Sequence, residues 1–266
     1  MSFPQPYVGV TGFMSRDEVH AVLTDEVRAE LHRSGRKLMV GVLASHKTLE
    51  GKPLDDKWCW RYPKIEDIAK IFPNDRDTLN LVHFNTKSPY LSYGMARVTR
   101  LAGPYFDGFQ LNVVWPDPDM VAIWAKMHMK HGQRVVLQLS QRALDIGDTD
   151  QDIVRRIEAY LDWGMTDILF DLSGGTGEQI IFSAYETFLR SLHDRFSPHD
   201  IGLGVSGGLG PDSLDALTSL FAKMGSSFSF DAEGRLRTII DPATGEDRLD
   251  TEKARQYVLN ALRLIK

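Results

Sequence analysis

Two glycine-rich turns hold the residue types in this sequence that are best suited to chemistry on a small ligand. Each turn follows an apolar run and leads into a predicted helix, so its backbone can approach an anion closely. A carboxyl group at the end of such a run, such as Asp171, can exchange a proton with a bound ligand. The alternatives are a tight turn without a ligand and a helix-capping carboxylate. The candidate site residues at the two turns are Asp171, Gly174, Gly175, Thr176, Gly177, Ser206, Gly207 and Gly208.

Further polar residues follow other apolar runs. Asp231 and Glu233 come after the last run, where two carboxylates would repel a dianionic group at short range. His46 follows the second run and is a candidate base, or else a polar rim residue. His83 lies inside the third run and is expected to be a core histidine with satisfied ring nitrogens. Amide and hydroxyl groups near other run ends, including Asn112, predict a pocket for a hydroxylated ligand. No metal site is expected.

The elements that must position these residues are short apolar runs separated by helical patterns. Each run has the length of a strand, and several are apolar on successive residues, as strands covered on both faces are. Strict alternation of strand and helix favours parallel strands joined by right-handed crossovers. Closure into a single-domain (β/α)₈ barrel over residues 1–266 is the predicted fold, and an open doubly wound sheet is the alternative. The runs are 7–13, 37–44, 79–86, 106–115, 134–140, 166–173, 201–208 and 226–231.

Helix signals and two long connections complete this pattern. Ser15 with Glu18 three residues later predicts a capping box at the start of the first helix. Segments 45–63 and 235–249 follow the second and eighth runs, so both should emerge at the carboxyl ends of the strands. Barrel enzymes bind their ligands at this face, and long structured loops there often act as lids.

Composition limits the classes of function. The chain of 266 residues has a formal net charge of −5, which argues against nucleic acid as a partner. No run approaches the roughly 18 apolar residues of a membrane span, and the first residues lack a signal-peptide pattern. A single cysteine, Cys59, leaves no intrachain disulfide and favours a reducing, cytoplasmic location. A small-molecule ligand is the expected partner, and a homodimer is left open.

The motifs resemble those of the phosphoribosylanthranilate isomerase family, over most of the chain. The most specific matches are Asp171 with its Gly-Gly-Thr-Gly turn, and Gly207-Gly208-Leu209 with Pro211. The resemblance implies a barrel that opens a phosphorylated aminoribose by an Amadori rearrangement without a cofactor. Asp171 would protonate the ring oxygen, Arg61 would face the substrate carboxylate, and Gln110 would belong to the strand 4 motif. Gly175, Thr176, Gly207 and Gly208 would lie along the phosphate.

Three positions depart from that family. Thr11 stands where the family has its cysteine base, and a hydroxyl needs a neighbouring base to remove a proton. Asn112 follows the strand 4 motif in place of histidine, and Ala232-Glu233 replaces the serine pair after strand 8. We therefore expect little or no phosphoribosylanthranilate isomerase activity. Thr11 is kept among the catalytic candidates with Asp171 and His46.

Two functions are consistent with these residues. The first is an enzyme of the isomerase or lyase kind that acts on a small sugar-like metabolite, with or without a phosphate, with Asp171 as general acid. The second is a barrel that has lost catalysis and binds a ligand or a partner. The position of Glu233 should show whether the ligand carries a phosphate. A Glu233 carboxylate that points into the mouth beside strands 7 and 8 would disfavour a phosphate there.

Overall fold

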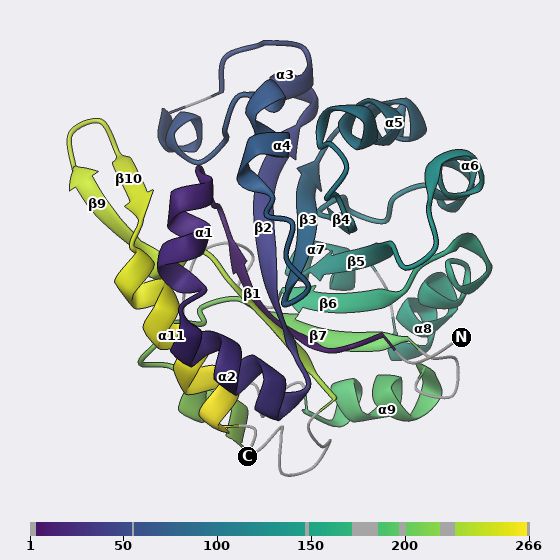
Figure 1. Ribbon diagram of the computed structural model, residues 1–266. Coiled ribbons are helices and arrows are strands. Elements are labelled where there is room, and N and C mark those ends of the chain that lie inside the picture. The colour runs from purple at the N-terminus through teal and green to yellow at the C-terminus, as the bar shows by residue number, and fades with distance from the viewer. Residues whose placement is uncertain are drawn as a thin grey trace.

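Eight parallel strands close into a barrel in a computed structural model of the chain, as predicted (Figure 1). The structure describes residues 4–54, 56–146, 149–171, 186–196, 201–218 and 227–264. Neighbouring strands follow one another in chain order, and β8 pairs with β1 to complete the ring. The strands are β1 (Tyr7–Thr11), β2 (Lys37–Ser45), β3 (Thr78–Asn85), β4 (Gly108–Leu111), β5 (Arg134–Ser140), β6 (Asp167–Asp171), β7 (Gly202–Ser206) and β8 (Ser229–Ala232).

Helices lie outside the ring, and several of them begin where the sequence supplies a capping side chain. Ser15 and Glu18 form the predicted capping box, and Thr149 caps α8. The predicted first helix is in fact two helices, because the Thr24 side chain caps a second start. The helices are α1 (Arg16–Val22), α2 (Asp25–Ser34), α3 (His46–Leu49), α4 (Ile68–Ile71), α5 (Leu91–Leu101), α6 (Pro118–His128), α7 (Gln141–Leu144), α8 (Asp150–Glu158), α9 (Glu186–Phe196) and α11 (Thr251–Leu264).

Short 3-10 helices connect several of these elements. They are η1 (Asp56–Trp60), η2 (Ile65–Asp67), η3 (Leu161–Trp163), η6 (Leu214–Leu217) and η7 (Gly234–Leu236). The described helices include none that is long and apolar enough to cross a bilayer.

The barrel interior changes from apolar to polar along its axis. Alternate residues of a strand point to the same face, so each strand sends every second side chain inward. The lower interior is an apolar cluster of Tyr7, Met39, Leu79, Leu81, Val136 and Leu169. Two residues further along these strands, the same face carries Gln138 from β5 and Asp171 from β6. The larger apolar core lies between the outer face of the sheet and the helices.

The segment after β8, predicted as a long structured loop over 235–249, contains a hairpin. Strands β9 (Arg237–Asp241) and β10 (Glu246–Leu249) pair antiparallel around the turn-prone residues 242–245. In Figure 1 the hairpin projects beside α1, on the side of the barrel where the 45–63 segment also lies. Hydrogen bonds from Arg61 to Asp247 join the 45–63 segment to the hairpin.

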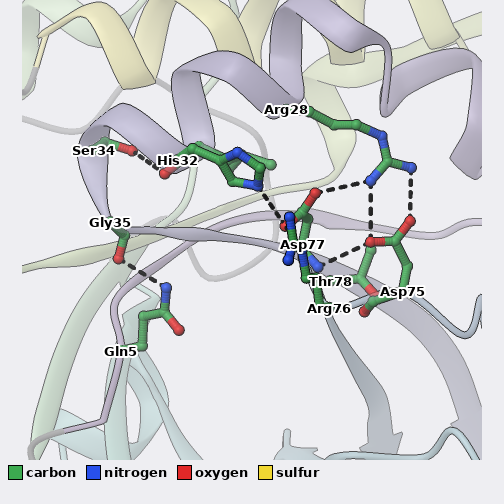
Figure 2. A network of polar contacts seen from close by, with 10 residues as sticks. Gln5, Arg28, His32, Ser34, Gly35, Asp75, Arg76, Asp77 and Thr78 are labelled. Atoms are coloured by element: carbon green, nitrogen blue, oxygen red, sulfur yellow. Dashed lines mark hydrogen bonds and ion pairs between the residues drawn. The ribbon is translucent and has the colours of Figure 1, made fainter.

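The opposite end of the barrel is held by a charged network (Figure 2). Arg28 of α2 contacts Asp75 at 2.6 Å and Asp77 at 2.9 Å, and the His32 ring lies 2.8 Å from Asp77. Asp75 and Asp77 precede β3, so the network ties α2 to the start of that strand. It is remote from the carboxyl ends of the strands and serves stability.

Candidate functional site

A cavity of about 470 Å³ opens at the carboxyl ends of the strands. Residues from β2, β3, β5, β6, β7 and β8 line it, together with Trp58 and Arg61 of the 45–63 segment. The cavity brings together most of the predicted site residues that the structure describes. Those that line it are His46, Arg61, Asn112, Asp171, Ser206, Gly207, Gly208, Asp231 and Glu233. Gly174, Gly175, Thr176 and Gly177 lie outside the described residues.

Strand register places the chemistry-bearing residues in one row. Asp171 of β6 pairs with Ser206 of β7, which in turn pairs with Asp231 of β8. Register partners in a sheet direct their side chains to the same face, so this row faces the cavity. Thr11 of β1 and Gln110 of β4 are fully buried and contact the row from the barrel interior.

A hydrogen-bonded chain across the barrel connects the two aspartates. Asp231 accepts hydrogen bonds from Thr11 Oγ1 at 2.9 Å and from Gln110 Nε2 at 2.9 Å. Gln110 Nε2 also donates to Gln138 Oε1 at 3.0 Å, and Gln138 Nε2 donates to Asp171 Oδ2 at 3.1 Å. The two amides, from the neighbouring strands β4 and β5, therefore link the carboxyl groups of β6 and β8, two strands that only β7 separates.

Two interior glycines make room for this arrangement. A Cβ at Gly41 would lie 2.4 Å from Thr11 Oγ1, and a Cβ at Gly9 would lie 2.8 Å from Asp231 Oδ1. Both distances are too short for real contacts, so each glycine leaves the space that its neighbour's polar atom occupies.

Asp231 is the group best tuned for proton transfer at neutral pH. Burial raises the pKa of its carboxyl to about 7, and the charges of Glu233 and Asp171 add to the rise. Hydrogen bonds from Gln110 and Thr11 act in the opposite direction. A group with a pKa near the ambient pH can both accept and release a proton. Asp231 was predicted as a ligand-binding residue whose charge would disfavour phosphate. A role in proton transfer was not predicted, because its partners Thr11 and Gln110 are remote in sequence.

Thr11, predicted to stand at the base position, acts as a donor. Its hydroxyl gives its proton to the Asp231 carboxylate, with oxygen distances of 2.9 and 3.1 Å. The residue therefore orients Asp231. The Asp231 carboxyl, and not the Thr11 hydroxyl, is therefore the group that can accept a proton here.

Arg61 lies at the cavity wall with all three guanidinium nitrogens engaged. Nη1 contacts Glu233 at 3.0 Å, and Nε and Nη2 contact Asp247 at 3.0 and 2.5 Å. Asp247 also accepts a hydrogen bond from Arg237 Nε at 2.6 Å. Burial raises the pKa of Glu233 although Arg61 opposes this shift. Contact between Arg61 and a substrate carboxylate stays a prediction, since the Arg61 guanidinium group is already hydrogen-bonded to Glu233 and Asp247.

The second glycine turn is partly occupied by its own contacts. Gly207 and Gly208 have φ of 101° and 61°, which side-chain-bearing residues rarely adopt. The Gly208 carbonyl accepts hydrogen bonds from Ser213 Oγ at 3.0 Å and from Arg235 Nη1 at 3.3 Å. Glu233 also lines this side of the cavity.

The opposite side of the cavity carries cations. His46 begins α3 directly after β2, and Lys47 and Lys87 line the rim nearby. The Nδ1 atom of His46 is buried and has no hydrogen-bond partner among the described residues. Within the described ranges, no group of three or more His, Cys, Asp or Glu side chains could hold a metal ion.

Comparisons with known proteins support the fold alone. No protein-family model and no curated protein sequence matches the chain. Tryptophan synthase subunit alpha from Legionella pneumophila str. Paris has 12% identity and a TM-score of 0.56, covering 98% of this chain and 92% of that one. Rubisco from Pyrococcus horikoshii OT3 has 14% identity and a TM-score of 0.54, covering 98% and 61%. Phosphonopyruvate hydrolase has 13% identity and a TM-score of 0.51, covering 87% and 80%. These similarities identify a TIM-barrel fold.

Proposed function

We propose that this protein is an enzyme of the isomerase or lyase kind that acts on a small polyhydroxylated carbonyl compound. The observation that carries the proposal is the pair of carboxyl groups, Asp171 and Asp231, fixed by Gln138 and Gln110 at the cavity floor. Asp171 is the general acid and Asp231 is the general base. The Asp231 carboxyl lies against Thr11, the position of the cysteine base in the isomerase family that the sequence resembles.

The chemistry needs one proton from carbon and one proton to oxygen. Asp231, as carboxylate, takes the proton from the carbon next to the carbonyl group. The C–H electron pair first moves toward the carbonyl oxygen and gives an enolate. As the carbonyl re-forms, a carbon–carbon double bond forms to the next carbon, the bond from that carbon to its oxygen breaks, and Asp171 protonates the departing oxygen. When the oxygen belongs to a ring the product is an open-chain isomer, and when it is a free hydroxyl the product is water and an enol. General acid–base steps of this kind each contribute typically 10²–10⁴-fold in rate.

An acidic or phosphate group on the ligand fits best toward the β2–β3 rim. Lys47 and Lys87 line that side, whereas Glu233 lines the β7–β8 side. The Arg61 guanidinium balances the charge of Glu233, so the β7–β8 side offers no surplus positive charge from this pair. The phosphate is therefore proposed to lie at the opposite side of the cavity from that implied by the family resemblance.

The test is a screen of ketose and aldose phosphates, with their unphosphorylated sugars, followed by proton NMR for product formation. Phosphoribosylanthranilate is included and is expected to give no turnover. Asp171→Asn should reduce any activity found by at least about 100-fold, because it removes the carboxyl group that the proposal assigns as general acid. Asp162→Asn, an exposed aspartate of η3 outside the cavity lining, is the matched control and should retain activity. Full activity in Asp171→Asn would contradict the proposal.

The same screen separates the enzyme from a barrel that only binds. A non-catalytic barrel would bind a compound without converting it, and Asp171→Asn would change affinity alone. The titratable Asp231 beside Asp171 favours the enzyme, since binding of a hydroxylated ligand does not need a buried carboxyl with a pKa near 7.

A further inference from the structure

His83 is a buried polar side chain that makes no hydrogen bond in the part of the chain that the structure describes. It lies on β3 with 6% of its surface exposed, and its side chain lines the cavity. Neither Nδ1 nor Nε2 has a hydrogen-bond partner among the described residues. This corrects the sequence-based expectation of a satisfied core histidine. Leaving a buried polar group unpaired costs about 1–3 kcal/mol, so a native fold rarely keeps one without a function.

The chemical state of this imidazole restricts what it can bind. Burial lowers the pKa of His83 to about 4, although the Asp171 charge acts in the opposite direction. The ring is therefore neutral near pH 7 and presents one N–H donor and one acceptor nitrogen. A neutral donor suits a carbonyl oxygen, on which negative charge grows during reaction, and it does not compete with the acids for protons.

The position of His83 matches that need. Its strand-register partner is Gln110, which donates to Asp231, and His83 lines the same cavity as Asp171. We infer that His83 donates a hydrogen bond to the carbonyl oxygen of the ligand and stabilises the charge that develops there. This inference rests on the proposed function. It adds a hydrogen-bond donor for the carbonyl oxygen, which the two aspartates do not supply.

The balance of protons and electrons is then complete. When Asp231 removes the proton beside the carbonyl, the electron pair moves toward the carbonyl oxygen, which His83 holds by its N–H. The pair returns as the bond to the departing oxygen breaks, and Asp171 protonates that oxygen. His83 keeps its own proton throughout. A preorganised donor of this kind is worth roughly 10²–10³-fold in rate where it has been removed from other enzymes.

A first test needs no ligand and uses thermal unfolding. Because the ring has no hydrogen-bond partner to lose within the described ranges, His83→Leu should leave the Tm unchanged or raise it. The matched control is Asn80→Leu on the same strand, where the buried amide donates to Pro73 and Tyr105 carbonyls at 2.9 and 2.8 Å. That variant should lower the Tm by several degrees. An equal fall in Tm for His83→Leu would show that the ring has a structural partner and would overturn the inference.

A second test uses two probes that differ only at the carbonyl group, D-ribulose 5-phosphate and D-ribitol 5-phosphate. Calorimetry should show that the native protein binds the ketone about tenfold more tightly, which corresponds to about 1.4 kcal/mol. His83→Leu should abolish this preference, and His83→Gln, which keeps an N–H donor, should retain part of it. A preference that persists in His83→Leu, or no preference in the native protein, would overturn the role of His83 alone. If neither compound binds, the proposed substrate class is wrong.

Discussion

Asp231 illustrates how the barrel interior changes a common residue into a titratable group at neutral pH. The carboxyl is 5% exposed, and Thr11 and Gln110 compensate only part of the cost of burying its charge. Because the pKa in the folded state, about 7, is above the ordinary value of 3.8, folding favours the protonated form. The free energy of unfolding therefore falls as the pH rises from the ordinary pKa of aspartate, 3.8, toward about 7.

Replacement of this carboxyl should consequently stabilise the protein in a pH-dependent way. Asp231→Asn should gain stability relative to the native protein as the pH is raised from about 5 to about 7, by up to roughly 1.4 kcal/mol per pH unit, and the gain should level off above that. Urea unfolding at pH 5 and at pH 8 measures the difference, with both proteins compared at each pH. A constant offset at both pH values would mean that the pKa of Asp231 is not raised.

At the scale of elements, a buried ion network joins the 45–63 segment to the β9–β10 hairpin beside the cavity. Asp247 of β10 binds Arg61 at 2.5 Å and Arg237 at 2.6 Å, and its side chain is 7% exposed. Arg237 Nη1 also donates to the Gly12 carbonyl just after β1. The network therefore fixes the cavity wall to which Trp58 and Glu233 belong.

Loss of Asp247 should be costly because it removes the carboxylate that binds the buried Arg237 and leaves Arg61 with Glu233 as its remaining ion-pair partner among the described residues. Asp247→Asn should lower the free energy of unfolding by about 3–5 kcal/mol. Glu246→Gln, next to it in the hairpin, breaks only a contact with the exposed Arg248 and should cost at most about 1 kcal/mol. Equal effects of the two substitutions in denaturant unfolding would show that the network does not hold the hairpin.

The predictable part of the structure at this scale is the set of elements with local signals. Eight apolar runs and caps such as Ser15 and Thr149 define strands and helix starts from adjacent residues alone. The hairpin was missed because Ile239 and Ile240 are exposed in it, so the alternation of a half-buried strand is absent. The predicted strand 106–115 is shortened to Gly108–Leu111, and Trp115 has a φ of 46° that no strand adopts.

On the scale of the whole molecule, the site could be located from the sequence but its chemistry could not. Residues at strand ends must meet at one face of a barrel, which is why Asp171, Ser206 and Asp231 were found. Contacts across the barrel depend on register and tilt, and no local pattern reports them. The Gln110–Asp231 hydrogen bond and the raised pKa of Asp231 depend on such contacts.

The network at the far end of the barrel should govern acid stability of the whole domain. The hydrogen bond from Arg28 lowers the pKa of Asp75. Burial would raise that of Asp77, but hydrogen bonds from His32 and Arg28 lower it on balance. Carboxyls whose folded-state pKa is lowered stabilise the fold above their ordinary pKa, near 4, and lose this contribution as the pH falls below it.

Arg28→Gln should therefore reduce the Tm clearly at pH 7 and less at pH 3, because Asp75 and Asp77 start to lose their charge as the pH falls toward their lowered pKa values. Circular dichroism melts at the two pH values give the comparison. If the variant were destabilised equally at both, the contribution of Arg28 would come from packing of its side chain and not from charge.

The central claim is that Asp231 removes a proton from carbon and Asp171 delivers one to oxygen. Deuterium incorporation from D₂O into the C–H beside the carbonyl of the best substrate, followed by proton NMR, tests it most directly. The native protein should exchange this proton and form product. Asp171→Asn should still exchange it but form little product, and Asp231→Asn should do neither. Exchange at the native rate in Asp231→Asn would contradict the assignment of the base.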